Sequence, residues 1–383
     1  MAEPTSNGGR ARVLASLTAL HTINDFYGLL LAPLLPALRA AFQLSYGQAG
    51  VIPFVSTGVS ALLQPTLGYW ADRHFLRRRL LVAGFVGYAV AAAWLSTAGS
   101  YSALLLAAAL LGLAASAYHP QSATYLVYYF RERRGFAQGI HGLGNGLGFF
   151  LAPLVVGVLI DAVGWHVAVR LLAVPGLLAA AIVLATLREP AIQGGRGLLA
   201  GVTRPLVLLT VINGLSLSAQ TGFQVWLPSY YAAQGYSLAQ SGLLTALMSL
   251  AGLLAQPSGG ALSDRLGRRG VVTLSLVGVS VFLALFLTSQ ALPLMILFSL
   301  LVGFCSSLMP PVAMVYASEL AAGQRTGVAV GVVWGLGTLI SAFSPLVSGQ
   351  AIDAFGFVAA YSGLAVVALG AAALSRTLPR AAS

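Results

Sequence analysis

Apolar stretches of about 20 residues follow one another along nearly the whole chain and are separated by short polar turns. Each stretch is long enough to cross the ~30 Å hydrocarbon core of a bilayer as a helix. In that core only helices and closed barrels satisfy their backbone hydrogen bonds, and barrel strands give weaker alternating patterns of about ten residues. The sequence therefore predicts an all-α integral membrane protein. Twelve transmembrane helices are expected, centred near residues 26, 59, 89, 115, 148, 176, 218, 250, 281, 305, 338 and 366.

The charged residues indicate how the chain lies in the membrane. Hydrophobic residues make up 58% of the chain and charged residues only 8%, whereas about a quarter of a soluble domain is charged. All 20 basic residues are arginine. If the spans alternate in direction, only Arg39 and Arg170 fall on the side away from the other arginines. Because positive residues gather on the cytoplasmic side, we expect an inner-membrane protein with both termini in the cytoplasm. Anionic lipid, and no nucleic acid, is the expected partner of these arginines.

A repeat divides the chain into two similar halves. The pattern Gly68-x-x-x-Asp72-Arg73 recurs as Gly260-x-x-x-Asp264-Arg265 at an offset of 192 residues. The same offset relates further pairs, namely Gln64 and Gln256, Pro65 and Pro257, Pro153 and Pro345, Asp161 and Asp353, and Gly164 and Gly356. Many carriers place a central site between duplicated sets of helices. We therefore predict two pseudo-symmetric six-helix bundles, at residues 1–190 and 206–383, joined by a cytoplasmic linker at 191–205.

Several kinds of function are excluded by what the sequence lacks. It contains no phosphate-binding Gly-x-x-x-x-Gly-Lys-Ser/Thr loop, so an ion or solute gradient, and not ATP, is expected to supply the energy. No cofactor, no metal-ligand spacing and no nucleophile motif is evident, which argues against an enzyme. The single Cys305 excludes a disulfide within the chain. The first apolar run continues to about Pro36 without a cleavage pattern, so we interpret it as a retained helix rather than a signal peptide.

The duplicated turn carries a family resemblance. Gly-x-x-x-Asp-Arg-x-Gly-Arg-Arg resembles the cytoplasmic loop signature of the major facilitator superfamily, and the second copy matches it in full while the first has Phe75 in place of a glycine. A glycine lets helices approach closely, and an aspartate can accept hydrogen bonds from an arginine or a helix N-terminus and so close the cytoplasmic face. The candidate gating residues of these two turns are Gly68, Asp72, Arg73, Gly260, Asp264, Arg265 and Arg268.

Within that superfamily, the first half resembles bacterial fosmidomycin-resistance-type exporters. The residues that carry this resemblance are His21-x-x-Asn24-Asp25, Leu63-Gln64-Pro65-x-x-Gly68-Tyr69-Trp70-x-Asp72, Tyr118-His119-Pro120, Gly135-x-Ala137-Gln138 and Gly144-Asn145. The resemblance implies a carrier that expels small polar or amphipathic toxic compounds in exchange for protons.

Ionisable residues inside the first half predict a proton site. A carboxylate in mid-bilayer costs about 2.5–3.5 kcal/mol, so Asp25 is expected to face a partner or a cavity. His21 lies four residues earlier on the same helix face, and imidazole titrates near neutral pH. We predict that Asp25 and His21 bind protons together with His119 and His141. The alternatives are that Asp25 only supports helix packing through the backbone or Asn24, and that the histidines are structural.

Neutral polar and aromatic residues are the candidates for substrate binding. Glutamines and aromatic rings in the second half could bind the polar and apolar parts of a small molecule. The candidate set is Asn24, Gln121, Asn145, Gln220, Gln224, Trp226 and Trp334. Trp226 alternatively belongs to the aromatic belt at the membrane surface. Asp161 and Arg170 bracket an outer turn, where we expect them to form an ion pair or to help close the outer gate.

Together these patterns predict a monomeric, proton-coupled secondary transporter that exports small toxic or amphipathic compounds by alternating access. The alternative is a proton symporter that imports an organic anion or another small metabolite. His119 and Arg170 fit this alternative nearly as well.

Overall fold

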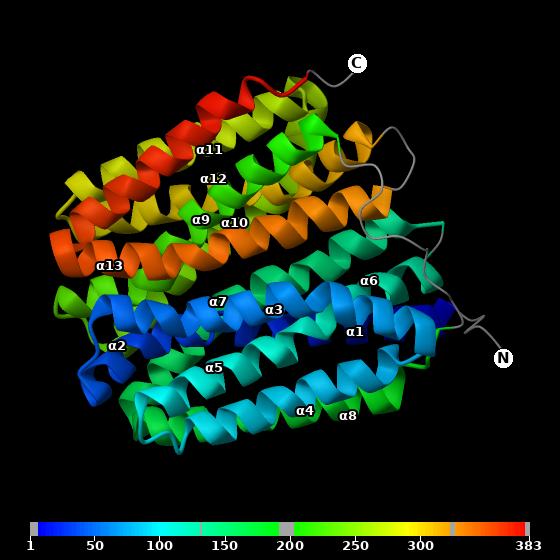
Figure 1. Cartoon of the computed structure of the whole chain (residues 1–383), viewed down its shortest axis with the longest axis horizontal. Coiled ribbons are helices and arrows are strands. Elements are labelled where there is room, and N and C mark those ends of the chain that lie inside the picture. Colours follow the sequence, from blue (N-terminus) through cyan, green and yellow to red (C-terminus); the bar gives the residue numbers. More distant parts are fainter. Residues whose placement is uncertain (1–6, 131, 191–202, 322–325, 380–383) are drawn as a thin grey trace.

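The computed structural model describes residues 7–130, 132–190, 203–321 and 326–379, and every regular element in these ranges is a helix (Figure 1). Most of the linker predicted at 191–205 lies outside the described residues. The helices are α1 (Asn7–Leu29), α2 (Leu31–Phe42), α3 (Tyr46–His74), α4 (Arg77–Leu95), α5 (Tyr101–Ser116), α6 (Tyr118–Tyr129), α7 (Arg134–Leu171), α8 (Ala173–Thr186), α9 (Arg204–Ala233), α10 (Leu238–Leu266), α11 (Arg268–Thr288), α12 (Leu292–Leu320) and α13 (Thr326–Ser375).

Ten segments of the described chain are long and apolar enough to cross a membrane. The all-helical membrane class is therefore confirmed, whereas the count of twelve spans stays a prediction. Two of the ten segments, Gly135–Thr186 and Ala329–Ser375, contain 52 and 47 residues. Since about 20 residues are enough for one crossing, both exceed the length that one span requires.

Prolines explain where three of these segments are interrupted. α1, α5 and α7 end at Leu29, Ser116 and Leu171, and a proline follows four residues later in each case. Proline has no backbone N–H, so the carbonyl four residues before it loses its helical partner. The break between α5 and α6 lies just before His119 and is explained by Pro120 in this way.

The repeat in the sequence is also a repeat in backbone geometry. Gly164 in α7 and Gly356 in α13 both leave the helical region, with φ of 75° and 80°. α3 and α10 begin with the same capping box, in which a serine and a glutamine exchange hydrogen bonds with the first turn, at Ser45 in α3 and at Ser237 in α10. These features make the two halves of the chain locally alike. The signature turn differs, because it has Phe75 in the first half and Gly267 in the second.

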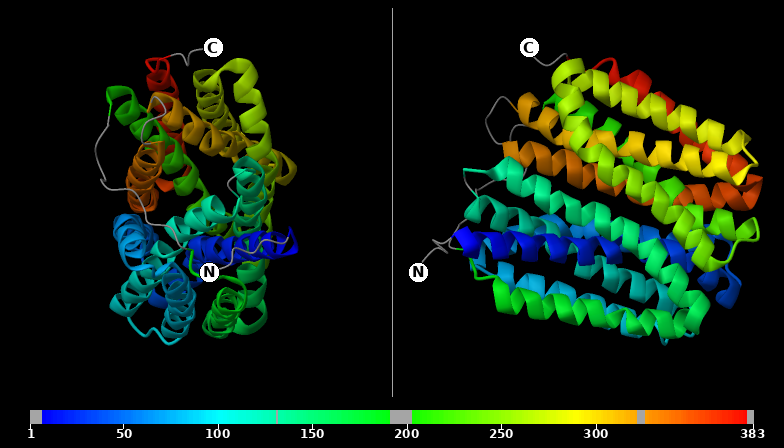
Figure 2. Two further views of the ribbon diagram at one scale, coloured as in Figure 1. Left: turned by 90° about the vertical axis from the view of Figure 1, so that its right-hand side faces the viewer. Right: turned by 180° about the vertical axis from the view of Figure 1, so that it is seen from behind.

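Helices α1–α8 form what we call the first half, and α9–α13 form the second half. The halves meet where α7 packs against α10 and where α3 packs against α13. Both ends of the described chain lie at the same end of the helices, which we call the terminal end (Figure 1). The opposite end is called the distal end. Figure 2 views the two groups of helices from the terminal end and from behind.

Glycines show that the described parts of the two halves approach each other most closely toward the distal end. A Cβ built on Gly157 of α7 would collide with the backbone of Leu238, and one on Gly50 of α3 would collide with the backbone of Pro345. Toward the terminal end, by contrast, a Cβ would meet no atom within 4 Å at Gly135 or Gly139 of α7, or at Gly331 or Gly335 of α13. The two halves therefore pack tightly at the distal end and diverge toward the terminal end.

The signature turn of the first half contains a strained residue. Phe75 has a φ of 52°, in the left-handed region, while Gly267 has a φ of 77° in the corresponding turn of the second half. In this region a residue with a Cβ is destabilised by roughly 1–2 kcal/mol, and a glycine would relieve this strain. Part of the stabilisation is offset because glycine also makes the unfolded chain more flexible. We expect Phe75→Gly to stabilise the protein by up to about 1 kcal/mol. Thermal unfolding of the purified protein in detergent would measure the change, and a lower melting temperature would contradict it.

Candidate functional site

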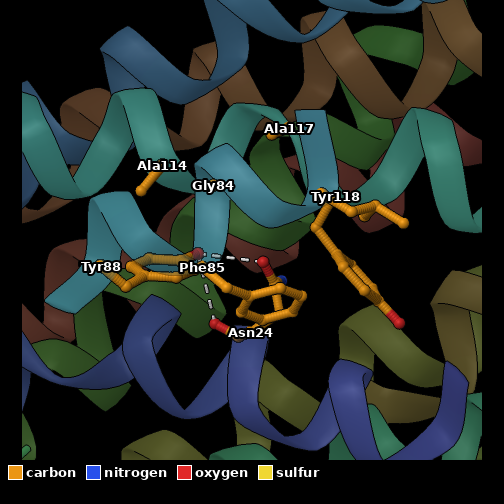
Figure 3. A pocket seen from close by; sticks show the side chains of 8 residues that line it. Asn24, Gly84, Phe85, Tyr88, Ala114, Ala117 and Tyr118 are labelled. Carbon is orange, nitrogen blue, oxygen red and sulfur yellow. Dashed lines mark hydrogen bonds between the residues drawn. The ribbon is translucent and has the colours of Figure 1, made fainter. Parts of the chain in front are cut away.

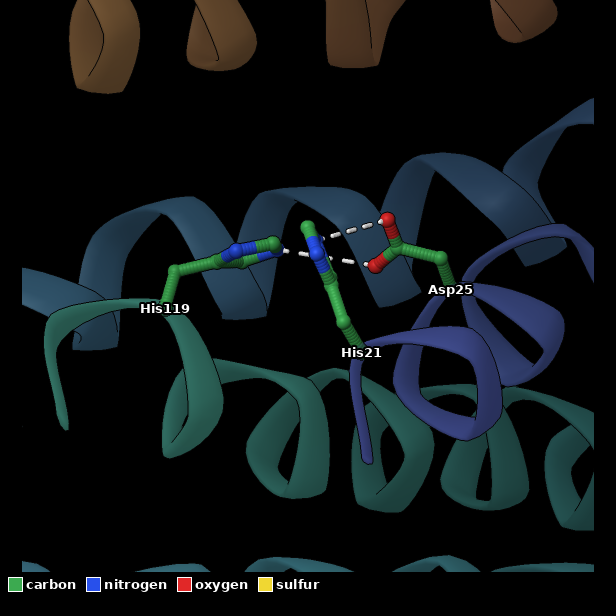
Figure 4. Close-up of side chains that lie close together, drawn as sticks. All are labelled: His21, Asp25 and His119. Carbon is green, nitrogen blue, oxygen red and sulfur yellow. Dashed lines mark ion pairs between the residues drawn. The ribbon is translucent and has the colours of Figure 1, made fainter. Parts of the chain in front are cut away.

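A buried carboxylate and two imidazoles meet in the first half (Figure 4). His21 Nε2 lies 3.2 Å from Asp25 Oδ2, one turn along α1. His119 Nε2, from the start of α6, lies 3.7 Å from Asp25 Oδ1. The His21 and Asp25 side chains are nearly inaccessible, while that of His119 is 36% exposed. His119 is therefore the most exposed member of the cluster.

Two amides hold the Asp25 carboxylate. Asn24 Nδ2 donates to Asp25 Oδ1 at 2.6 Å, and Asn145 Nδ2 of α7 donates to Asp25 Oδ2. Asn24 is itself oriented by the Tyr88 hydroxyl, which donates to Asn24 Oδ1 at 2.9 Å (Figure 3). Hydrogen bonds to an ionised oxygen are stronger than bonds between neutral groups. This arrangement can therefore accommodate a negative charge on Asp25 away from water.

The protonation of His21 follows from its second nitrogen. His21 Nδ1 lies 2.8 Å from the backbone carbonyl of His141. Because a carbonyl only accepts hydrogen bonds, Nδ1 must carry a proton. Neutral His21 consequently turns an unprotonated Nε2 toward Asp25. A proton that binds in the gap between the two side chains can reside either on the carboxyl group or on the imidazole.

His141 extends the cluster but is engaged differently. Its ring stacks on that of His21, with centroids 4.1 Å apart. His141 Nε2 lies 3.1 Å from the Tyr118 hydroxyl, which itself donates to the carbonyl of Leu17 at 2.7 Å. The hydroxyl proton is thus already used, so His141 Nε2 is the donor of their shared bond. The four predicted proton-binding residues lie together, with His141 behind His21 rather than against Asp25.

The same cluster has the spacing of a metal site. One ligand atom each from His21, Asp25 and His119 lies within 4.8 Å of the others. The sequence analysis grouped these three residues as a proton site but did not predict this spacing, because His119 comes from another helix. Both Asp25 oxygens, however, already accept hydrogen bonds from amides. The carboxylate oxygens are thus already engaged by hydrogen bonds, and the proton site at these residues stays a prediction.

Two aspartates at the distal end bind helix N-termini of the opposite half. Asp161 of α7 accepts a hydrogen bond from the backbone N–H of Ala239 in α10 at 2.9 Å. Asp353 of α13 accepts from the N–H groups of Tyr46 and Gly47 in α3, at 2.8 and 2.7 Å. A carboxylate at a helix N-terminus also interacts favourably with the helix dipole. We call these two contacts the distal latches.

The expected ion pair between Asp161 and Arg170 is wrong, since no such pair is found between these two described residues. The physical reason is that Asp161 accepts a hydrogen bond from the backbone N–H of Ala239, which the capping box of α10 leaves free. Asp353, which the repeat relates to Asp161, was not among the candidate gating residues although the 192-residue offset pointed to it.

At the terminal end, the signature aspartates bind arginines of their own halves. Asp72 pairs with Arg77, and Asp264 lies 2.5 Å from Arg268. Arg77 is fully buried and also lies 3.8 Å from Glu189, while Arg268 contacts Glu319 at 3.0 Å. These glutamates and Arg77 are partners that the sequence analysis missed. Neither pair joins the two halves in this conformation.

The two signature glycines, Gly68 and Gly260, are not equivalent. A Cβ on Gly68 would lie 3.3 Å from Pro120, whereas one on Gly260 would meet nothing within 4 Å. The close helix approach is therefore confirmed only at Gly68. Of the remaining signature residues, Arg73 donates to the Tyr69 hydroxyl at 2.9 Å, and Arg265 is exposed.

The candidate substrate residues are scattered. Asn24 and Asn145 belong to the proton cluster, and Gln121 is buried with Nε2 3.5 Å from the carbonyl of Leu67. Gln224 is also buried and donates to Ser249 at 3.1 Å. Trp226 is fully buried, with Nε1 donating to Ser348 at 3.0 Å, so its membrane-belt alternative is wrong. The remaining two candidates, Gln220 and Trp334, are half-buried.

Comparison with known proteins places the chain in a family. The family model described as Major Facilitator Superfamily matches residues 15–244 and 206–383. The chain therefore belongs to the major facilitator superfamily, which comprises membrane transporters and not enzymes. A solved bacterial homologue of the human lysosomal transporter Spinster, in an inward-facing and unoccupied conformation, superimposes with a TM-score of 0.83. It is 18% identical and covers 97% of this chain and 98% of its own.

Among relatives, the fosmidomycin resistance protein of Escherichia coli (strain K12) is 29% identical over 361 residues, covering 88% of this chain and 86% of the relative. The nitrite extrusion protein of Bacillus subtilis (strain 168) is 25% identical over 374 residues, covering 94% and 92%. A probable sulfoacetate transporter of Cupriavidus necator is 28% identical over 303 residues, covering 69% and 70%. The resemblance predicted from the first-half motifs is thus confirmed, while the relatives' names indicate different substrates.

Proposed function

We propose that this protein is a proton-coupled antiporter that exports small toxic or amphipathic compounds by alternating access. The observation that carries the proposal is the Asp25–His21 pair, which binds one proton inside the first half. A buried acid is costly in a membrane, so it is retained where ion or proton movement uses it. The likeness to the fosmidomycin resistance protein supports export as the direction.

The proton site is suited to bind and release a proton during transport. His119, which is partly exposed and 3.7 Å from Asp25, is the expected path between the pair and water. Asn24 and Asn145 keep the ionised carboxylate solvated by hydrogen bonds after the proton leaves. The proton can therefore leave Asp25 without a large rearrangement of its neighbours, and the cargo is expected to bind nearby between the halves.

The conformation corresponds to one state of such a cycle. We propose that each of the two long segments crosses the membrane twice by bending at Gly164 or Gly356, which gives twelve spans in two six-helix bundles, at residues 1–190 and 206–383. The arginine distribution then makes the terminal end cytoplasmic. Contact at the distal end with divergence at the terminal end describes an inward-facing carrier, in agreement with the inward-facing structural neighbour.

Transport of a small anion is the second candidate. The relatives named for nitrite extrusion and sulfoacetate transport favour it, as does the pair of histidines beside Asp25, which can carry positive charge. In this case a protonated His119 would contact the anion, and a proton would travel with it or against it.

Transport into inside-out membrane vesicles tests the proposal. Vesicles that contain the protein are acidified inside, and their uptake of fosmidomycin or nitrite is measured. Vesicles without the protein serve as the control. A proton-coupled exporter accumulates its cargo only while the interior is acidic, and it releases protons from the interior as the cargo enters. Uptake of either probe that is the same with and without the pH gradient would refute proton coupling. Active uptake of nitrite alone would select the second candidate.

A further inference from the structure

Gln256 of α10 connects the proton site of the first half to the second half. Its side-chain Nε2 donates to Asn145 Oδ1 at 3.1 Å. Asn145 in turn donates to Asp25 Oδ2 through its Nδ2. A continuous chain of two hydrogen bonds thus runs from the Asp25 carboxylate, through one amide, to a residue of the opposite half.

The place of this contact sets it apart from the distal latches. Gln256 lies 17 residues beyond Ala239 on α10 (256 minus 239), which is about 25 Å along the helix. A Cβ on Gly142 of α7 would lie 3.7 Å from Gln256 Oε1, whereas one on Gly139, the next glycine toward the terminal end, would meet nothing within 4 Å. The Gln256–Asn145 bond therefore lies at the edge where the contact between α7 and α10 ends.

We infer that Gln256 is a positioning residue through which the charge on Asp25 holds the two halves together and so keeps the distal side closed. This inference rests on the proposed proton coupling. When Asp25 is ionised, its bond from Asn145 is charge-assisted, and such bonds are roughly twice as strong as neutral ones. A polarised amide is also a better acceptor, so the bond from Gln256 is strengthened as well. When the Asp25–His21 pair holds a proton, on the carboxyl group or on the imidazole, the negative charge is neutralised and both bonds weaken.

Of the groups that surround Asp25, Asn145 is the one that can carry the effect of its charge to the second half. The titratable side chains near the carboxylate are His21 from α1, Tyr88 from α4, Tyr118 and His119 from α6, and His141 from α7. All of them belong to the first half. Among the described residues close to the carboxylate, Asn145 is the one whose side chain also bonds across to α10.

The relay has a consequence for efficiency. A carrier that has released its proton inward but has no cargo must not return to the outward-facing state, because that cycle would leak protons. In that form Asp25 is ionised and the relay is strongest, so the distal side stays closed until cargo supplies the energy to open it. Removing Gln256 should therefore increase proton leak without cargo.

The repeat provides a matched control. Gln64 of α3 corresponds to Gln256, but its Nε2 donates at 3.1 Å to Ser60 of its own helix. Gln256→Leu and Gln64→Leu each replace one glutamine by an apolar side chain of similar size. Proton leak is measured in cargo-free liposomes that contain a pH-sensitive dye, after the outside solution is made more acidic than the interior. The pH profile of transport is measured separately. For Gln256→Leu we expect the leak to rise roughly fivefold, the effect of losing one hydrogen bond, and the pH profile to flatten.

The control variant Gln64→Leu should keep the wild-type leak and pH profile. Asn145→Leu combined with Gln256→Leu should leak no more than Asn145→Leu alone, because both remove the same relay. If Asp25→Asn abolishes coupling as proposed but Gln256→Leu behaves like Gln64→Leu, the relay is refuted while the proposed function stands. If the wild type itself shows no dependence on protons, the proposed function fails first.

Discussion

Replacing Asp25 by asparagine is expected to abolish accumulation of cargo against its gradient. The amide has nearly the same shape as the carboxyl group but cannot take up a proton beside His21 Nε2, which lies 3.2 Å from Asp25. A difference of one pH unit stores about 1.4 kcal/mol per proton, which supports about tenfold accumulation of a neutral cargo. In vesicles with this gradient, wild-type protein should approach that ratio, and Asp25→Asn should reach only equal concentrations on the two sides.

Exchange of labelled for unlabelled cargo, without any pH difference, shows whether the Asp25→Asn variant is still folded and able to change conformation. We expect exchange to persist because it needs no net proton transfer. Glu132→Gln, which makes the same change at an exposed carboxylate outside the candidate site and gating residues, is the matched control and should accumulate cargo normally. Full accumulation by Asp25→Asn would remove Asp25 from the coupling mechanism.

Breaking both distal latches is expected to shift the protein toward a state open at the distal end. Asp161 and Asp353 each satisfy backbone N–H groups at a helix N-terminus of the opposite half, but both side chains are exposed to solvent. Loss of such a cap costs about 1 kcal/mol. The double variant Asp161→Ala with Asp353→Ala should therefore lose about 2 kcal/mol of closure, a shift of roughly 30-fold in the ratio of the two states.

Distances between spin labels at the distal end would measure this shift. Labels at Gly99 and Gln234, which lie in exposed turns of the first and second halves, require prior replacement of Cys305 by alanine. The longer-distance population should grow in the double variant and to a smaller extent in each single variant. Asp264→Ala should not lengthen the distance. An unchanged distribution in the double variant would show that apolar packing alone keeps the distal end closed.

Local patterns in the sequence predicted the fold well. Hydrophobic length predicted the helices, and the 192-residue offset predicted a repeat that the similar backbone angles of Gly164 and Gly356 share. The spacing of His21 and Asp25 on one helix face was sufficient to predict their contact, because helix geometry alone brings residues four apart together. These features depend on neighbours along the chain.

The contacts between the halves could not be predicted in the same way. Gln64 and Gln256 are equivalent in the repeat, yet of these two only Gln256 bonds to the Asp25 cluster. The 192-residue offset takes Asp25 to Leu217 and Asn145 to Gly337, so the second half offers Gln64 no equivalent cluster. Trp226 has the composition of a membrane-belt residue and is nevertheless fully buried against α13. Such choices depend on how distant helices dock, which leaves no periodic trace in the sequence.

The protonated Nδ1 of His21 has an electrical consequence. Since that nitrogen is committed to a carbonyl, the gap to Asp25 has room for one hydrogen ion, and under the proposed coupling one ion moves in each cycle. Exchange of that ion for an uncharged molecule moves net charge across the bilayer, so export of neutral compounds should quicken when the cell interior becomes more negative. Each 100 mV then contributes about 2.3 kcal/mol per cycle, and cells with little pH difference could still expel such compounds.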